Sequence, residues 1–121
     1  MSYESVYYRA ENGDEPVRLF RNRLNYKIQQ RFFAREEQLL QAFGERLSQP
    51  HVKYLGDGLW ELKVDFGNLA YRFVYFLHGH FVVHVHAFQK KTQKTPGQEL
   101  KIACARRKHF YQQLEHGGID L

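Results

Sequence analysis

The spacing of apolar residues changes near residue 52, and this change constrains the fold more than any other feature of the sequence. From Leu59 to Phe66, apolar and polar residues alternate, as they do in a strand with one covered face. The next two runs, Tyr71–Leu77 and Phe81–Phe88, are apolar on both faces, which is typical of central strands covered on both sides. Turn residues separate these runs, so with a short strand at Val52–Leu55 they predict an antiparallel meander of four strands.

Helical spacing dominates the chain before this point. Ser5–Arg9 predicts a short first strand, which a turn follows. Asp14 or Glu15 before Pro16 predicts the start of a helix, because proline is tolerated at the first helical position. A second, amphipathic helix is predicted from Ile28 to Leu47. Two helices in a hairpin and one long bent helix both fit this part of the sequence.

A last helix is predicted to begin at Thr95 and to end at His116–Gly118. Thr95 and Gln98 have the spacing of a capping box, and Pro96 would occupy the first helical position. The order of elements predicts an α+β fold: an N-terminal strand and two helices packed on an antiparallel four-stranded meander, followed by a C-terminal helix. A length of 121 residues suits a single domain, which we expect to span residues 1–121.

Composition excludes several classes of protein. The sequence has no run of about 18 apolar residues, so we expect no membrane-spanning segment. The first five residues have neither the basic start nor the apolar stretch of a signal peptide. Cys104 is the single cysteine, which excludes an internal disulfide and a cysteine-based zinc cluster. We therefore expect a protein of the reducing cytoplasm.

The net charge of +5 is unevenly distributed along the chain. Residues 1–86 contain eleven Lys and Arg against ten Asp and Glu, whereas residues 87–121 contain seven against three. The densest basic run is Lys90–Lys94, immediately before the predicted last helix. Such a run is compatible with a solvated turn, but its position beside a helix start favours a polyanionic partner.

Basic side chains also gather on the polar face of the predicted meander. Glu61 and Lys63 are two residues apart and project together, and hairpin pairing can bring Arg72 near Lys63. The sheet then leads into a basic, hydroxyl-rich segment beside the unpaired backbone amides of a helix start, which attract anions. The candidate phosphate-binding residues of this segment are Lys90, Lys91, Thr92, Lys94 and Thr95.

A cationic face of this kind suits the cleavage of RNA by its own 2′-hydroxyl. The attack requires removal of a proton, stabilisation of negative charge on phosphorus and neutralisation of the leaving 5′-oxygen. A lysine crowded by other cations has a lowered pKa and can act as a base or an acid. An arginine stays protonated and grips a phosphate with two hydrogen bonds. None of these steps requires a metal, and we predict neither a metal site nor a cofactor.

The seven histidines raise an alternative, metal-binding interpretation. His78 with His80, and His84 with His86, have the spacing that places two rings on one face of a strand. No Cys, Asp or Glu stands within a few positions of either pair, so structural roles are favoured over a metal site. His86, which is nearest the lysine run, is also a candidate proton shuttle.

Three motifs carry a resemblance to a known family: Leu59–Lys63, Tyr71–Tyr75 and His86–Pro96, of which the last is specific. Together they resemble the HigB-type, phage-derived branch of the RelE/ParE toxin superfamily. The resemblance covers nearly the whole chain and implies a RelE-like fold. It also implies the toxin of a type II toxin–antitoxin module, which cleaves mRNA, often on the translating ribosome.

The resemblance implies roles for individual residues. Lys63 falls where RelE-type nucleases have a basic strand residue, and Arg72 falls on the strand arginine that contacts the scissile phosphate. Lys91 falls near the basic residue taken to help the leaving group. Glu61 departs from the pattern, because the best-known ribosome-dependent members have a basic residue there. Gly97 stands about where those members have a tyrosine, which leaves the acid and the base open.

Partners are implied in the same way. The toxin would be neutralised by a cognate helix-turn-helix antitoxin and would meet operator DNA only through that complex. Arg106 and Arg107 belong either to a solvated helix face or to an extension of the binding surface for ribosomal RNA. The rival interpretation is a non-nuclease, ParE-like toxin or binding module that inhibits a protein target such as gyrase. The basic residues Lys63, Arg72 and Lys91 favour the nuclease, because ParE-like members lack that set.

Overall fold

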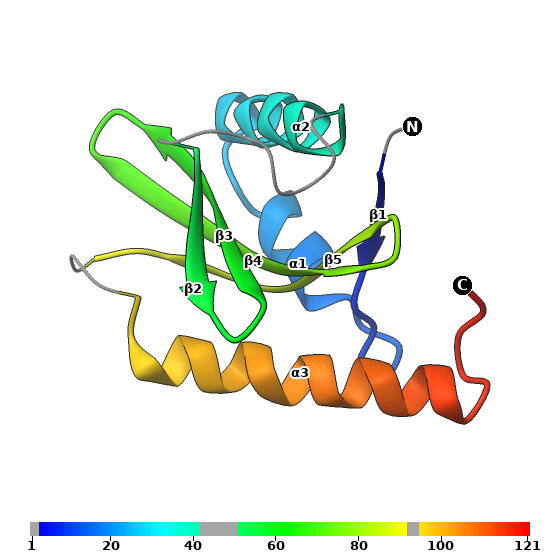
Figure 1. Ribbon diagram of the computed structural model, residues 1–121. Coiled ribbons are helices and arrows are strands. Elements are labelled where there is room, and N and C mark those ends of the chain that lie inside the picture. The colour runs from blue at the N-terminus through cyan, green and yellow to red at the C-terminus, as the bar shows by residue number, and fades with distance from the viewer. Residues whose placement is uncertain (1–2, 42–50, 92–94) are drawn as a thin grey trace.

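The structure is a computed structural model that describes residues 3–41, 51–91 and 95–121. Within these residues it contains one five-stranded sheet, with the strands in the order β1-β5-β4-β3-β2 (Figure 1). The strands are β1 (Glu4–Tyr7), β2 (Val52–Gly56), β3 (Leu59–Phe66), β4 (Leu69–His78) and β5 (Phe81–Gln89). The helices are α1 (Pro16–Asn22), α2 (Tyr26–Gln41) and α3 (Gly97–Glu115). The predicted α+β class is confirmed.

The sheet contains the predicted meander and one further strand, β1, whose position differs from the prediction. Strands β2 to β5 pair antiparallel in chain order, as predicted. Strand β1 was expected to pack on the meander, but it pairs parallel with β5, with Glu4 opposite Phe81, and so makes a mixed sheet of five strands. Parallel pairing joins segments that are far apart in the sequence, so local patterns give no signal for it.

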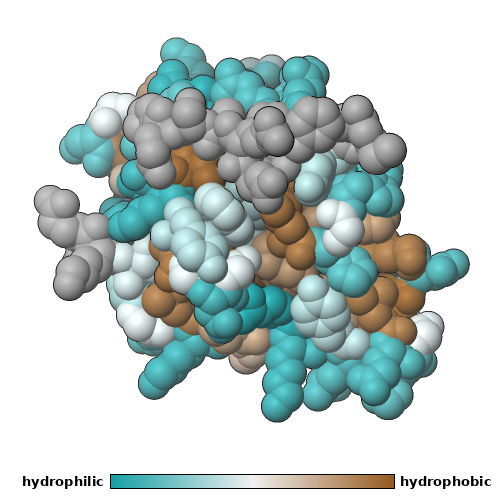
Figure 2. Space-filling model, viewed as in Figure 1, coloured by the Kyte–Doolittle hydropathy of each residue, from teal (hydrophilic) through white to brown (hydrophobic). Residues whose placement is uncertain are grey.

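Helices cover both faces of the sheet. Helices α1 and α2 lie on one side and α3 on the other (Figure 1). The core under α1 and α2 includes Phe32 and Phe73, and the core under α3 includes Val74 and Phe110. This arrangement explains why β4 and β5 are apolar on both faces. Figure 2 shows hydrophilic side chains along the outer side of α3. No helix within the described ranges is long and apolar enough to cross a membrane.

The first two helices are separate, which decides between the hairpin and the single bent helix. Helix α1 begins at Pro16, as predicted. Helix α2 begins at Tyr26, two residues before the predicted Ile28. The side-chain oxygen of Asn25 accepts a hydrogen bond from the backbone N–H of Lys27 at 2.8 Å, so Asn25 caps the new helix and fixes the break. The predicted end at Leu47 lies outside the described residues.

Helix α3 begins at Gly97, two residues after the predicted start at Thr95. The predicted capping box is wrong: Pro96 is the N-cap residue, with an extended ψ of 144°, and no side chain caps the helix. The hydroxyl of Thr95 donates instead to Oε1 of Glu61 on β3, at 2.9 Å. The Thr95 hydroxyl, which the sequence predicted to cap the helix, is therefore bonded to the buried carboxylate of Glu61.

A β-bulge separates the two histidines of β5. Val74 of β4 lies opposite His86 and the next residue, Tyr75, lies opposite His84, so one residue of β5 is inserted between the two pairs. The ring of His84 consequently packs under α2, 6.0 Å from the ring of Phe32. The ring of His86 faces α3, where its Nε2 contacts Glu99 at 2.9 Å. The prediction that both rings share one face is wrong. In a strand that is apolar on both faces, the sequence pattern does not reveal the extra residue of a bulge.

Candidate active site

Two cross-strand pairs place polar side chains on the α3 side of the sheet. Lys63 of β3 lies opposite Arg72 of β4, so the predicted pairing of these residues is confirmed. Lys53 of β2 lies opposite Glu61 of β3. Directly opposed residues point to the same face, and Lys63 and Glu61 are two residues apart, so all four side chains share that face.

Arg72 is held in a fixed position by its neighbours. Arg72 is 7% exposed, and its Nη1 donates to Oδ1 of Asp65 at 2.6 Å and to the carbonyl oxygen of Tyr71 at 2.9 Å. Its Nε lies 3.8 Å from Oε1 of Glu61. Two carboxylates therefore orient the arginine, one exposed and one buried, before any ligand is present.

Glu61 is completely buried, although the sequence placed it on a polar face. Thr95, two residues before α3, donates to its Oε1 at 2.9 Å. Within the described residues, Oε2 of Glu61 and Nε of Arg72 have no hydrogen-bond partner. A buried ion pair with unsatisfied atoms is costly to maintain, and such exceptions call for a functional explanation.

Lys90 completes a group of four cations that we name the basic cluster: Lys53, Lys63, Arg72 and Lys90. Its backbone N–H donates to the carbonyl oxygen of Ala70 at 2.7 Å, which fixes the chain at this point. Burial lowers the pKa of Lys90; Glu61 opposes this shift, and Arg72, Lys53 and Lys63 add to it. Lys90 can therefore release a proton more readily than an ordinary lysine.

Lys90 belongs to the basic cluster, whereas the resemblance assigned a catalytic role to the next residue, Lys91. Phe88 lies opposite Arg72, so Lys90, two residues further along, points to the same face. Lys91 is exposed and follows the end of β5. Sequence reasoning also missed Lys53, although the turn at residues 56–58 is a hairpin signal that would have paired it with Glu61.

Of the remaining predicted site residues, Arg106 and Arg107 make their described contacts away from the basic cluster. Thr92 and Lys94 lie outside the described residues. Arg107 contacts the Asp57 carboxylate at 2.8 Å and so ties α3 to the β2–β3 turn. Nη1 of Arg106 donates to the carbonyl oxygen of Val85 at 2.9 Å, so Arg106 is half-buried and joins α3 to β5, a contact that neither sequence alternative included.

His86, the candidate proton shuttle, is engaged at both ring nitrogens. Nε2 lies 2.9 Å from Glu99, and Nδ1 lies 3.1 Å from Nη1 of Arg106. Burial lowers the pKa of His86, and the carboxylate of Glu99 opposes this while the charge of Arg106 adds to it. These contacts attach α3 to β5, so the geometry favours a structural role for His86.

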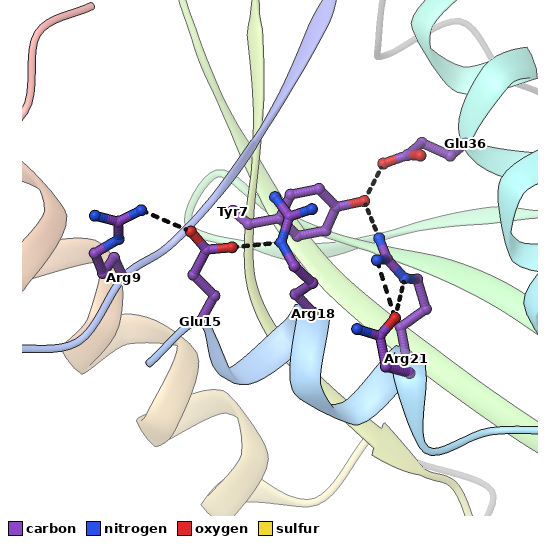
Figure 3. A network of polar contacts seen from close by, with 7 residues as sticks. Tyr7, Arg9, Glu15, Arg18, Arg21 and Glu36 are labelled. Carbon is purple, nitrogen blue, oxygen red and sulfur yellow. Dashed lines mark hydrogen bonds and ion pairs between the residues drawn. The ribbon is translucent and has the colours of Figure 1, made fainter. Parts of the chain in front are cut away.

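A second polar network lies on the opposite side of the sheet, and Figure 3 shows three of its residues, Tyr7, Arg21 and Glu36. Oε2 of Glu36 accepts hydrogen bonds from Ser5 at 2.8 Å and from Tyr7 at 2.6 Å, and it lies 3.2 Å from Nε2 of His84. Arg21 donates to the Tyr7 hydroxyl at 3.2 Å. Burial raises the pKa of Glu36, but these partners outweigh it and lower the pKa to about 2. We name Ser5, Tyr7, Arg21, Glu36 and His84 the Glu36 network.

The histidine pairs do not assemble a metal site in the part of the chain that the structure describes. No group of three His, Cys, Asp or Glu side chains lies close enough together there to hold a metal ion. His80 contacts the exposed Glu4 at 2.8 Å, and His84 belongs to the Glu36 network.

The fold and the basic cluster define the class of protein: a small α+β chain with a cationic site on one sheet face. Residues 22–108 match the family described as Phage derived protein Gp49-like (DUF891), and the chain belongs to this family. It is a RelE/HigB-type toxin family of toxin–antitoxin systems, which implies an antitoxin partner. The matched residues include the whole basic cluster. No curated protein matches the chain.

Proposed function

We propose that this protein is a HigB-type toxin that cleaves mRNA, on the ribosome and in the cytoplasm, with the basic cluster as its active site. One observation carries the proposal: Arg72 is buried, pre-oriented by two carboxylates, and directly opposed to Lys63. A guanidinium fixed in this way can grip a phosphate without first losing conformational freedom. The phosphate would displace the exposed carboxylate of Asp65, while the buried Glu61 keeps the arginine in place.

The reaction is a transfer within the RNA chain. The 2′-oxygen forms a bond to phosphorus, the bond from phosphorus to the 5′-oxygen breaks, and the products are a 2′,3′-cyclic phosphate and a 5′-hydroxyl. Lys90, whose pKa is lowered, accepts the proton of the 2′-hydroxyl. Arg72 and Lys63 stabilise the charge that develops on the phosphoryl oxygens. Lys91 keeps the role that the resemblance implies and donates a proton to the leaving 5′-oxygen.

Glu61 is a positioning residue in this scheme. It holds Arg72 through an ion pair of 3.8 Å, and Thr95 at the entrance to α3 holds Glu61. Glu61, the acidic residue that departs from the family pattern, therefore keeps Arg72 in place. The toxin is neutralised by a helix-turn-helix antitoxin and meets operator DNA only through that complex.

The direct test is to induce expression and map the 5′ ends of cellular mRNA. We expect new ends that carry 5′-hydroxyl groups within coding regions, and their formation by purified protein and ribosomes in the presence of EDTA. Intact mRNA together with inhibited DNA supercoiling would instead support the ParE-like alternative. Loss of cleavage on chelation would contradict a metal-independent mechanism.

A further inference from the structure

A second group of cations lies at the far end of β3. Arg31 and Arg35 of α2, His51 before β2, and Lys63 and Asp65 of β3 line a pocket of about 120 Å³. Lys63 belongs both to this pocket and to the basic cluster. The pocket therefore continues the candidate active site around the edge of the sheet.

The pocket forms because β3 is longer than its neighbour. Strand β2 begins at Val52, and the last backbone contact along this edge is from the N–H of Lys63 to the carbonyl oxygen of His51, at 2.8 Å, so β3 from Val64 onwards lies beyond the paired part of β2. Arg31 reaches this open edge from α2: its Nη1 donates to the carbonyl oxygen of Asp65 at 3.0 Å, and its guanidinium lies 5.3 Å from the ring of Phe66. These contacts hold one wall of the pocket in place.

The charges in the pocket are not balanced. Among the described residues of its lining, Arg31, Arg35 and Lys63 stand against one acidic residue, Asp65, so the excess of positive charge persists whether or not Arg72 engages Asp65. Within the described residues, the side chains of Arg35 and Lys63 form no hydrogen bond or ion pair. Burial and then the charge of Arg35 lower the pKa of His51, against the opposing effect of Asp65. An anion would relieve this excess of positive charge.

We propose that the pocket binds a second phosphodiester of the RNA backbone, adjacent to the one that Arg72 holds. This inference rests on the proposed function, because it defines the length of RNA that the same site recognises. A phosphodiester offers two non-bridging oxygens to a planar guanidinium, and the ring N–H of a neutral histidine can donate to either. Lys63 lies between the two phosphates and contacts both. The minimal RNA ligand therefore contains two adjacent internucleotide phosphates.

The first test follows the NMR signals of the His51 ring during titration with inorganic phosphate. We compare the wild type with Arg35→Gln and with Arg23→Gln, which removes the same charge from an exposed position at the end of α1. Saturable shifts are expected in the wild type and in Arg23→Gln, with about tenfold weaker binding in Arg35→Gln. Equal affinity in the two variants, or no shift at His51, would overturn the proposal.

The second test uses 2′-O-methyl oligonucleotides, which cannot be cleaved, and so does not depend on activity. A trinucleotide has two internucleotide phosphates and a dinucleotide has one. We expect the wild type and Arg23→Gln to bind the trinucleotide about tenfold more tightly, and Arg35→Gln to lose this preference. If all three proteins showed the same preference for the trinucleotide, the proposed phosphate site in the pocket would be refuted.

The two proposals can fail separately. Selective phosphate binding at His51 in a protein that leaves mRNA intact would support the pocket and contradict the nuclease. Cleavage of mRNA by a protein whose Arg35→Gln variant keeps the trinucleotide preference would support the nuclease and contradict the pocket.

Discussion

Each face of the sheet carries a carboxylate among polar partners, but Glu36 is half-buried and Glu61 is fully buried, and their partners differ. Glu36, on α2, receives two hydroxyl hydrogen bonds and the ring of His84 on a single oxygen. Glu61, under the start of α3, receives one hydroxyl and a distant Nε of Arg72, and its Oε2 has no partner within the described residues. The Glu36 network is not entirely saturated either, because Nδ1 of His84 also has none there.

The difference between the partners of Glu36 and Glu61 indicates different roles for the two carboxylates. A carboxylate that gathers several donors has a low pKa and stabilises the fold. A carboxylate that shares its arginine with the exposed Asp65 leaves that arginine able to exchange partners. We therefore assign the Glu36 network to folding and the Glu61–Arg72 pair to ligand binding, and the following variants test that division.

The largest effect is expected from Arg72→Ala. Removing the phosphate grip should lower the rate of mRNA cleavage about 100- to 1000-fold and relieve growth arrest. Arg21→Ala is the matched control, because Arg21 is an equally buried arginine of the Glu36 network, 8% exposed against 7%. It should reduce stability but retain cleavage in the folded protein. Cleavage assays with circular dichroism of both variants measure this, and full toxicity of Arg72→Ala would refute the site.

The next effect is on stability and comes from Glu36→Gln. The pKa of Glu36 falls from 4.5 to about 2 on folding, which corresponds to about 3 kcal/mol of stability at pH 7. Because the folded pKa is the lower one, this contribution is present above about pH 4.5 and is lost as the pH falls through about 2.

Urea denaturation at several pH values measures this contribution. The wild type should be more stable than Glu36→Gln at pH 7, and the two curves should converge in acid. Glu37→Gln, at the neighbouring exposed position, should change the free energy of unfolding by less than about 0.5 kcal/mol. A constant difference between wild type and Glu36→Gln across the pH range would contradict the assigned pKa.

Lys90→Arg tests the proposed base. Arginine keeps the charge but does not release its proton, so the cleavage rate should fall about 100-fold while RNA affinity changes little. The wild-type rate should rise with pH towards the lowered pKa of Lys90, and the variant should lose this rise. Lys91→Arg is the control and should retain the pH dependence. The opposite pattern would assign the base to Lys91.

Thr95→Val should have the smallest effect. It removes the hydrogen bond to Oε1 of Glu61 and should reduce stability by about 1–2 kcal/mol, measured by thermal unfolding. Thr95→Ser restores the hydroxyl and should recover most of the loss. If Thr95→Val were as stable as the wild type, the buried Glu61 would not depend on the start of α3.

Sequence reasoning predicted the parts of the candidate site that depend on local geometry. The opposition of Lys63 and Arg72 follows from alternation and a tight turn, so it could be read from the sequence. The structure adds Lys53 and Lys90 to the cations on this face, and both additions depend on strand register and packing. Sequence reasoning placed Glu61 on an open face, since the sequence does not show that Thr95 contacts β3.

The sequence by itself determined the class of fold, the meander and the start of α1 at Pro16, because periodicity and turn chemistry are local. It also showed that basic residues follow the end of the meander. The tertiary structure decided which of those residues meet. Parallel pairing of β1, the bulge that turns His86 towards α3, and the open edge of β3 beside Arg35 all arise from contacts between distant segments. Long-range packing sets the surroundings of each charge, and those surroundings separate the structural carboxylate, Glu36, from the one proposed to serve RNA, Glu61.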